Sequence, residues 1–425
     1  MENKKLKILM FNRWVGYNEG GNETHIKELA VFLSKKGHKI DIITTGEEAL
    51  IPIKEHINKI WQVASPRKYF SYSSKRFIYS FIYLLKSFFI FYKLLKIKKI
   101  KYDIITVHFS LEAFLLRFVR AVFNIPYALI LVGDTDMELI EGKRADNTSE
   151  LTEYMARECL NYCYYPKILT KGVDRARFNR KVNGHKVRNL YINNKKQFLI
   201  LTVCRLEPRK NLETLIKSAK ILENKYPNIF KFVIIGGGIE ENKLKNMVKK
   251  YRLNNVYFTG MIYSTSSLLP QYYASADIFA LPTLYEGFGY VFSEAMSFGL
   301  PVIGTDTSAV PEVVSGTGII IPLRSPIKLS QAIYSIYSDS KLRKELSRKS
   351  LKKVENWYWD KLIMDYEKFL YEAINKNRKY NNSYKRYKRC FSDLFFDFPK
   401  ILFIGLRPLY KTKNSWGSIL NKRYE

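Results

Sequence analysis

The chain has 425 residues, which is enough for two or three domains with hydrophobic cores, so a short peptide module is excluded. Hydrophobic residues make up 47% and charged residues 26%, with only 14 Pro and 21 Gly, which excludes a disordered or collagen-like chain. The 71 Lys and Arg exceed the 39 Asp and Glu by 32, and this excess predicts a negatively charged partner: nucleic acid, anionic lipid or a phosphorylated ligand.

The sequence shows no clear pattern for disulfides, a zinc site, a signal peptide or a transmembrane helix. The four cysteines are too few for a disulfide scaffold and form neither a CxxC repeat nor a zinc pattern, so we expect a reducing cytoplasm. The first apolar run, residues 8–11, is too short for a signal peptide. The most hydrophobic stretch, residues 77–95, is interrupted by Lys86 and Lys93, so we expect no transmembrane helix.

In the first half of the chain, short apolar runs alternate with helical patterns. Strand-like runs cover residues 6–11, 40–45, 102–109 and 127–133. An amphipathic helix is predicted over 24–37. Runs that are apolar at every position predict strands covered on both faces, which is typical of a parallel, doubly wound sheet. We therefore predict an α/β, Rossmann-like N-terminal domain over residues 1–180, shortened near 134–170, where no strand is identified.

The same alternation restarts after a polar linker at residues 181–196. Predicted strands of this half cover residues 197–203, 230–237, 254–260, 277–282, 300–305 and 318–322. Helices are predicted over 211–225 and 241–251. We assign 197–360 to a second Rossmann-like domain and 361–425 to a C-terminal helix followed by a basic, aromatic tail.

Residues 282–303 combine a strand end, a glycine loop and a helix start. Gly287 and Gly289 leave the loop without bulky side chains, so backbone N–H groups and the positive end of the helix dipole can face a phosphate. Glu286 and Glu294 are eight residues apart, about 12 Å along a helical direction. Two carboxylates at this separation can accept hydrogen bonds from hydroxyls on both sides of a central diphosphate, an arrangement that a nucleotide sugar presents.

Two cations follow the strand predicted at 197–203. Arg205 offers a bidentate fork for phosphate oxygens, and Lys210 offers a mobile point charge. Both lie at the C-terminal edge of a parallel sheet, where open α/β folds bind ligands. Solvated surface charge is the alternative interpretation, and the nearby Glu-bearing loop favours diphosphate binding.

The second half resembles the nucleotide-sugar-binding half of family 4 (group 1) glycosyltransferases, which are retaining enzymes of the GT-B fold, with two Rossmann-like domains facing a cleft. The matching motifs are Arg205-x4-Lys210, the glycines at 236–238, Glu286-Gly-Phe-Gly-x4-Glu294-Ala, Gly299-x-Pro301 and Pro311-Glu312. The residues that the resemblance assigns to donor binding are Arg205 and Lys210 (diphosphate), Gly236 and Gly237, Glu286 with the backbone of Gly287, Phe288 and Gly289 (sugar), and Glu294 (ribose). It implies catalytic roles for Glu286, Arg205 and Lys210.

The N-terminal half resembles the same family more loosely. Gly20 and Gly21 match its glycine loop, whose backbone approaches the donor phosphate across the cleft, and Gly172-Val173-Asp174 with Phe178 matches its GVDxxxF signature. Many members carry His before a Gly where this chain has Val132 before Gly133, so a substrate-orienting imidazole is not expected at that position.

The resemblance implies that sugar is transferred with retention from a nucleoside-diphosphate donor to an acceptor hydroxyl, on a lipid-linked or surface glycan. It implies no cofactor and no required metal. Two alternatives stay open: a non-catalytic sugar-nucleotide or glycan-binding subunit, and a GT-B phosphorylase or epimerase.

Two N-terminal polar residues are candidates for the acceptor site. His108 ends the strand at 102–109 and either faces the cleft or is packed and hydrogen-bonded. Asp134 begins an Asp134-Thr135-Asp136 triplet, which binds a metal in other glycosyltransferase folds. Here it follows a strand of the N-terminal domain, so an acceptor-site or helix-capping role is favoured over metal binding.

Two segments hold most of the excess positive charge. Residues 66–101 contain ten basic and no acidic residues, and residues 376–425 contain 13 basic and three acidic residues. Aromatic residues lie beside basic ones in both, which favours peripheral binding to an anionic membrane at its cytoplasmic face. A buried helix with a solvated tail is the alternative. Nucleic acid is not an expected partner, because no zinc finger, RNP-type or basic-zipper motif is present.

Overall fold

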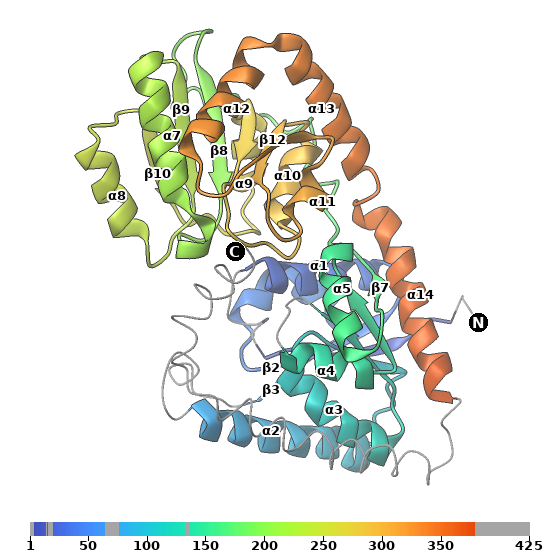
Figure 1. The fold of residues 1–425 in the computed structure, drawn as a ribbon. Helices are drawn as coiled ribbons and strands as arrows, with labels where there is room; N and C mark the ends of the chain where they lie inside the picture. The colour runs from blue at the N-terminus through green and yellow to red at the C-terminus, as the bar shows by residue number, and fades with distance from the viewer. Residues whose placement is uncertain (1–3, 14, 16–19, 64–75, 132–135, 379–425) are drawn as a thin grey trace.

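The structure is a computed structural model that describes residues 4–13, 15, 20–63, 76–131 and 136–378. Two all-parallel sheets each form the centre of an α/β domain, and one domain lies above the other in Figure 1. The doubly wound architecture predicted from the apolar runs is confirmed.

The N-terminal sheet has seven strands in the order β3-β2-β1-β4-β5-β6-β7. They are β1 (Lys7–Phe11), β2 (Lys39–Thr44), β3 (Lys59–Gln62), β4 (Ile104–Val107), β5 (Tyr127–Ile130), β6 (Asn147–Glu150) and β7 (Lys167–Ile168). Ile8 and Met10 of β1 enter one core cluster, and Leu9 and Phe11 enter the other. Residues 8–11 of β1 are therefore all apolar, because helices cover both faces of the sheet.

Helices from distant parts of the chain cover these two faces. α1 (Gly21–Lys35) and α14 (Trp359–Arg378) cover one face, and α2 (Arg76–Tyr92) and α3 (Ser110–Phe123) cover the other. The helix predicted at 24–37 corresponds to α1.

The N-terminal sheet continues through the segment where the sequence showed no strand. β6 is buried although its sequence is Asn-Thr-Ser-Glu, and β7 has only two residues, so neither carries an apolar run. Asn147 of β6 donates from Nδ2 to the carbonyl of Phe369, which satisfies part of this buried polarity. The expectation that residues 134–170 lack a strand is therefore wrong. Two helices also lie in this part of the chain, α4 (Asp136–Arg144) and α5 (Glu153–Glu158).

The C-terminal sheet has six strands in the order β10-β9-β8-β11-β12-β13. They are β8 (Phe198–Val203), β9 (Phe230–Ile235), β10 (Val256–Gly260), β11 (Ile278–Ala280), β12 (Val302–Thr305) and β13 (Gly318–Ile321). The helices are α7 (Leu212–Lys225), α8 (Glu241–Lys250), α9 (Leu268–Ser275), α10 (Tyr290–Ser297), α11 (Val310–Val314), α12 (Pro326–Ser338) and α13 (Ser340–Val354). Within 181–196, α6 (His185–Arg188) packs on this domain through Val187, so this segment is more than a bare connector.

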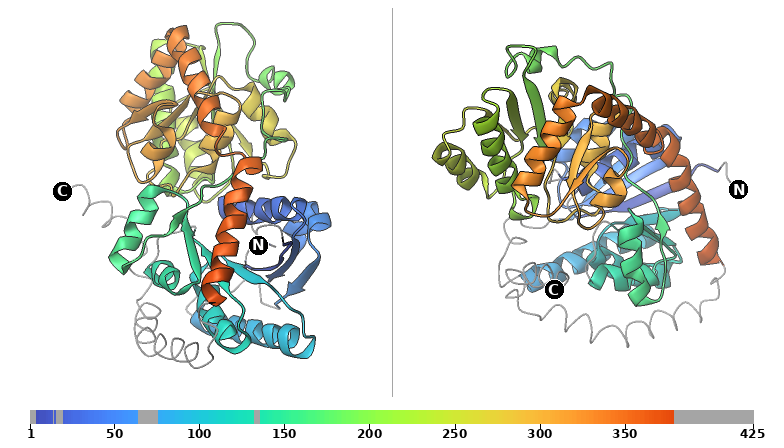
Figure 2. Two further views of the ribbon diagram at one scale, coloured as in Figure 1. Left: turned by 90° about the vertical axis from the view of Figure 1, so that its right-hand side faces the viewer. Right: turned by 45° about the horizontal axis from the view of Figure 1, so that its top comes forward.

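The end of the described chain returns to the N-terminal domain. α14 packs against α1 and the strands β4, β5 and β6, with Trp359 and Tyr366 fully buried. Figure 2 shows α14 running alongside that domain after α13 has packed on the other. Gly172 lies under the Trp359 ring, because a Cβ at residue 172 would lie 2.4 Å from a ring carbon. The chain therefore crosses between the domains at two adjoining places.

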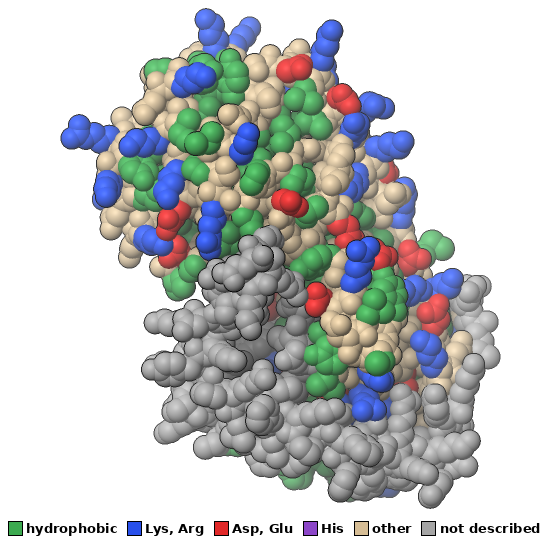
Figure 3. Space-filling model, viewed as in Figure 1, with side chains coloured by type: hydrophobic (Ala, Val, Ile, Leu, Met, Phe, Trp, Pro, Cys, Tyr) green, Lys and Arg blue, Asp and Glu red, His purple; other side chains and the backbone are tan. Residues whose placement is uncertain are grey.

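The positive charge of the described surface is dispersed on the face seen in Figure 3, where Lys and Arg side chains spread over the C-terminal domain. The tail at 379–425 and the basic residues at 64–75 lie outside the described residues. Among the helices that the structure describes, none combines the length and apolar content needed to cross a bilayer.

Candidate active site

Lys210 and Glu286 meet at the C-terminal edge of the second sheet. Lys210 ends a short 3-10 turn after β8, and Glu286 lies in the loop between β11 and α10. Lys210 Nζ donates to Glu286 Oε1, and the two side chains are only 9% and 12% exposed. The structure therefore brings together the cation and the carboxylate that the sequence placed at this edge.

The backbone of Glu286 is fixed from both directions. Its N–H donates to Ser308 Oγ (2.9 Å), and its carbonyl accepts from the N–H of Ala309 (3.2 Å). These two hydrogen bonds hold the loop that carries the carboxylate, which favours a preorganised site.

Each residue of the loop at 287–289 has a different role. Gly289 precedes α10 with φ of 77°, a conformation that favours glycine. The side chain of Phe288 is buried edge-on against Trp357 (ring centroids 5.3 Å apart), so only the backbone of Phe288 remains to contact a ligand. A Cβ at Gly287 would lie 2.8 Å from Sδ of Met155 in the N-terminal domain, so this glycine allows the two domains to approach.

Arg205 has a more open position than Lys210. Its side chain is 51% exposed, and Nη1 forms an ion pair with Glu207 Oε1 (3.0 Å). A half-exposed guanidinium held by one carboxylate can turn toward an incoming phosphate at small cost.

The glycines after β9 let two loops approach closely. A Cβ at Gly236 would lie 1.8 Å from the carbonyl oxygen of Cys204, and Gly237 accepts through its carbonyl from the N–H of Leu206 (2.9 Å). Gly236 and Gly237 therefore shape the loop that carries Arg205.

Glu294 is enclosed within α10. It accepts from Tyr273 Oη at 2.6 Å and is 4% exposed. Burial raises its pKa to about 8, against the opposing influences of the Tyr273 hydrogen bond and the Arg177 charge. Near neutral pH this carboxyl therefore holds a proton for much of the time.

Lys171 lies at the start of α1 and interacts electrostatically with Lys210 and Glu286 of the other domain. Gly20 caps this helix and Gly21 is its first residue, and Lys171 Nζ donates to Asn22 Oδ1 (2.7 Å). Burial lowers the pKa of Lys171 to about 8, while the charges of Glu23 and Glu286 oppose the shift. Sequence reasoning missed Lys171, although it directly precedes the signature at 172–174.

Glu28, also missed, joins three parts of the molecule. It accepts hydrogen bonds from Tyr290 Oη of α10 and from Trp359 Nε1 of α14 (2.7 Å). Burial raises the pKa of Glu28 to about 7. No local motif marks this residue, because its partners lie more than 250 positions away in the sequence.

His108 lies buried at the end of β4, 5.9 Å between ring centroids from His25. His108 is thus packed, as one of the two alternatives expected, but neither ring nitrogen has a hydrogen-bond partner among the described residues. Burial and the nearby Lys171 charge lower its pKa to about 3, so the imidazole is neutral. Asp134 lies outside the described residues, and the described part contains no group of three or more His, Cys, Asp and Glu suited to a metal.

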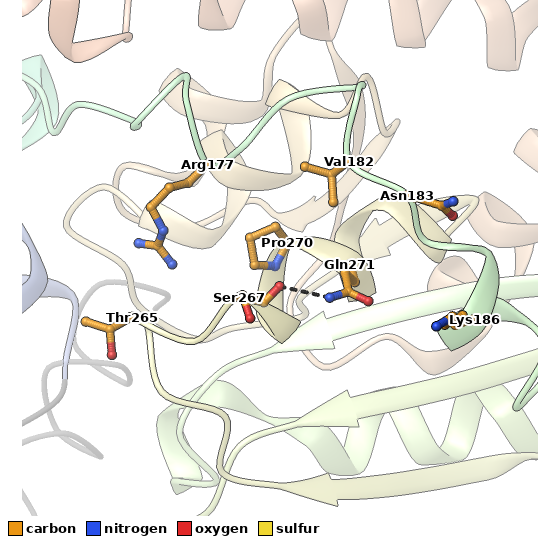
Figure 4. A pocket seen from close by; sticks show the side chains of 8 residues that line it. All are labelled: Arg177, Val182, Asn183, Lys186, Thr265, Ser267, Pro270 and Gln271. Carbon is orange, nitrogen blue, oxygen red and sulfur yellow. Dashed lines mark hydrogen bonds between the residues drawn. The ribbon is translucent and has the colours of Figure 1, made fainter. Parts of the chain in front are cut away.

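A pocket of about 520 Å³ is lined by residues of the crossing segment, of the linker and of the C-terminal domain. Its lining residues are Arg177, Val182, Asn183, Lys186, Thr265, Ser267, Pro270 and Gln271 (Figure 4). Arg177 is fixed at its rim by a hydrogen bond to the carbonyl of Ser264 (2.5 Å). None of the site residues predicted from sequence lines this pocket, so we assign the chemistry to the groups around Lys210 and Glu286.

Two family models match the chain. Residues 186–353 match the family described as Glycosyl transferases group 1, and residues 19–130 match Glycosyltransferase Family 4. The two matches cover most of both domains and contain Lys210, Glu286 and Glu294.

Individual relatives agree with these models. The chain is 25% identical to an uncharacterized glycosyltransferase of Methanocaldococcus jannaschii, over 81% of this chain and 93% of that protein. It is 29% identical to O-antigen chain mannosyltransferase B of Escherichia coli and 30% identical to a capsular polysaccharide biosynthesis glycosyltransferase of Staphylococcus aureus. These matches cover 36% and 42% of this chain and 41% and 48% of those proteins, so the chain spans less than half of each.

Solved structures show the same fold. Sucrose-phosphate synthase from Thermosynechococcus elongatus superposes with a TM-score of 0.70 at 20% identity, over 86% of this chain and 98% of that one. HepE of Anabaena, solved with UDP and glucose, gives a TM-score of 0.70 at 16% identity, over 86% and 99%. The predicted two-domain GT-B architecture is confirmed by these likenesses.

Proposed function

Because the chain belongs to family 4 of the glycosyltransferases, the group 1 enzymes, we propose that it transfers a sugar from a nucleoside-diphosphate donor to an acceptor hydroxyl with retention at the anomeric carbon. The observation that carries this proposal is the buried Lys210–Glu286 pair at the C-terminal edge of the second sheet. That edge is where a parallel α/β domain binds its ligand.

In the proposed reaction, the bond between the anomeric carbon and the diphosphate oxygen breaks, and the acceptor oxygen bonds to the same face of that carbon. The acceptor proton passes to the departing phosphate. Lys210, Arg205 and the N-terminus of α10 stabilise the negative charge that develops on the diphosphate, and Glu286 orients the sugar hydroxyls. Glu294 accepts from the ribose hydroxyls. The proposed reaction uses no metal or other cofactor.

The relatives support the class of donor and acceptor. HepE was solved with UDP and UDP-glucose, and the Escherichia coli and Staphylococcus aureus relatives are named for O-antigen and capsular polysaccharide synthesis. We therefore propose a glycan acceptor, carried on a lipid or on the cell surface.

A panel of nucleoside-diphosphate sugars tests this proposal. The true donor raises the melting temperature because it binds only the folded state, and its nucleoside diphosphate is released when an acceptor glycan is added. Binding without release in the presence of any acceptor favours the non-catalytic subunit. Release of a sugar 1-phosphate or an epimerised nucleotide sugar favours a phosphorylase or epimerase.

The proposal also places the enzyme at the cytoplasmic face of an anionic membrane, with α2 as the attached surface. Exposed apolar side chains recur along one face of this helix, at Ile82, Leu85, Phe89 and Tyr92. Phe89 is 67% exposed. Lys86 and Lys93 are exposed on the same side of the helix, and residues 76–102 contain no acidic residue.

The opposite face of α2 packs into the domain through Tyr83 and Phe91, so the described part of α2 has one packed face and one exposed face. Apolar and basic side chains on one exposed face match an interface of acyl chains and anionic headgroups. A second copy of the chain would bring like charges together, which disfavours a dimer through this face. Figure 1 shows α2 at the far side of the N-terminal domain from the other domain, so attachment through α2 keeps the membrane away from the place where the domains meet.

Vesicle sedimentation tests this attachment. We expect binding to vesicles with anionic lipid and none to neutral vesicles, and Phe89→Ser should weaken binding by about 30-fold because burying this ring is worth about 2 kcal/mol. Leu190→Ser removes a comparably exposed side chain from the C-terminal domain and is the control. Tighter binding to RNA or duplex DNA than to anionic vesicles at physiological salt would overturn the attachment.

A further inference from the structure

The backbone around Lys171 is held rigidly where the two domains meet. The N–H of Val173 donates to the carbonyl of Trp357 (2.8 Å), and Tyr366 Oη donates to the carbonyl of Thr170 (3.2 Å). Lys171 therefore projects from a fixed point of the crossing segment.

The ammonium group of Lys171 lacks a compensating charge at contact distance. Its side chain is almost wholly buried, and Nζ donates to the neutral amide oxygen of Asn22. Within the described ranges, no carboxylate lies within ion-pair distance of it. A buried cation with only a neutral partner is costly, so this arrangement favours a site that binds an anion.

The charged groups around Lys171 have both signs. Nζ lies 3.8 Å from where a Cβ of Gly21 would stand, at the positive end of the 15-residue helix α1. Lys210 repels Lys171, whereas Glu23, Glu286 and Glu28 attract it. Glu286 is already paired with Lys210, so part of its charge is neutralised.

The imidazoles near Lys171 are neutral and supply no negative charge. Neither nitrogen of His108 has a partner among the described residues, and Nδ1 of His25 has none there either. Two ammonium groups and the positive end of α1 thus lie near one another where the domains meet, beside the carboxyl groups of Glu23, Glu28 and Glu286. The oxygens of a diphosphate can accept hydrogen bonds from both ammonium groups at this place.

We infer that Lys171 is a third cation of the donor site, which binds the diphosphate from the N-terminal side of the cleft, opposite Lys210. This inference rests on the proposed donor class. Lys171 belongs to the crossing segment and Lys210 to the C-terminal domain, so a diphosphate that touches both couples donor binding to the position of the domains.

Calorimetric titration with inorganic pyrophosphate and with nucleoside diphosphates tests the role of Lys171. We expect Lys171→Met to raise the dissociation constant about 10- to 150-fold, because one charge-assisted contact is lost. Lys171→Arg should retain part of the affinity. Lys341→Met removes the same charge from the exposed surface of α13 and should change the constant less than about twofold.

The outcomes separate this inference from the proposed function. Wild-type protein that binds neither pyrophosphate nor any nucleoside diphosphate refutes both. If a folded Lys171→Met variant binds these ligands as tightly as wild type does, the role of Lys171 alone is refuted. The unfolding midpoints of the two proteins show whether the variant is folded. The affinity for the matching nucleoside, which lacks phosphate, should be equal in both proteins, and a parallel loss there would assign Lys171 a structural role instead.

Discussion

Glu294 combines deep burial with a single hydrogen bond from Tyr273. Burial raises its pKa from 4.5 to about 8, so the folded protein holds this proton more tightly than the unfolded chain does. The free energy of unfolding therefore falls as the pH rises from about 4.5 to about 8, by at most about 1.4 kcal/mol per pH unit from this group.

Glu294→Gln removes this titration and keeps an acceptor for Tyr273. We expect the stability of the variant relative to wild type to increase between pH 5 and pH 8, by up to about 1.4 kcal/mol per unit. Urea unfolding without ligand at several pH values measures the difference. A difference that stays constant over this range would show that Glu294 titrates near its ordinary value.

Local motif spacing was enough to predict the positions of Lys210 and Glu286, because each follows a strand of the same parallel sheet. It was not enough for Lys171 and Glu28. Their roles depend on which residues of one domain face the other, and no period or spacing within either domain encodes that relation.

At the scale of elements, the start of α10 depends on Gly289. Its φ is 77°, and a Cβ there would lie 2.6 Å from a ring carbon of Phe292. Gly316 has φ of 81° with nothing within 4 Å of its Cβ position. Substituting Gly316 therefore introduces backbone strain alone, whereas substituting Gly289 introduces both backbone strain and a steric clash.

We expect Gly316→Ala to lower the free energy of unfolding by about 1 to 2 kcal/mol, the cost of the left-handed conformation alone. Gly289→Ala should cost more and should also lower kcat/KM, because the displaced loop carries Glu286. Chemical unfolding and steady-state kinetics of both variants measure these effects. Equal turnover in the two variants would show that the conformation at Gly289 does not position the active-site loop.

The strands that the sequence predicted are those with continuous apolar runs, such as β1 and β8. β6 escaped prediction because its side chains are polar, and the partner of Asn147 is a distant group, the carbonyl of Phe369 in α14. The run at 147–150 alone gives no hint of that partner.

At the scale of the whole molecule, several hydrogen bonds join the domains. Glu312 of α11 accepts from the backbone N–H groups of Glu153 and Tyr154 at the start of α5 (3.0 Å each), and Thr152 Oγ1 donates to the carbonyl of Gly287 (3.2 Å). These contacts hold the site loop against the N-terminal domain.

Glu312→Ala should loosen this arrangement. Loss of these exposed contacts costs about 1 kcal/mol, so we expect a larger radius of gyration by small-angle X-ray scattering and about a fivefold loss in kcat/KM. Glu345→Ala, which removes an exposed carboxylate on α13, is the control. Unchanged scattering for Glu312→Ala would show that the other contacts hold the domains without it.

The most direct test of the account is the kcat/KM of Lys210→Ala with the identified donor, because the proposed chemistry depends on a cation at the diphosphate. We expect a loss of about 10- to 150-fold, the equivalent of about 1.5 to 3 kcal/mol of transition-state stabilisation, while Lys341→Ala retains full activity. Wild-type turnover by a folded Lys210→Ala protein would contradict the account.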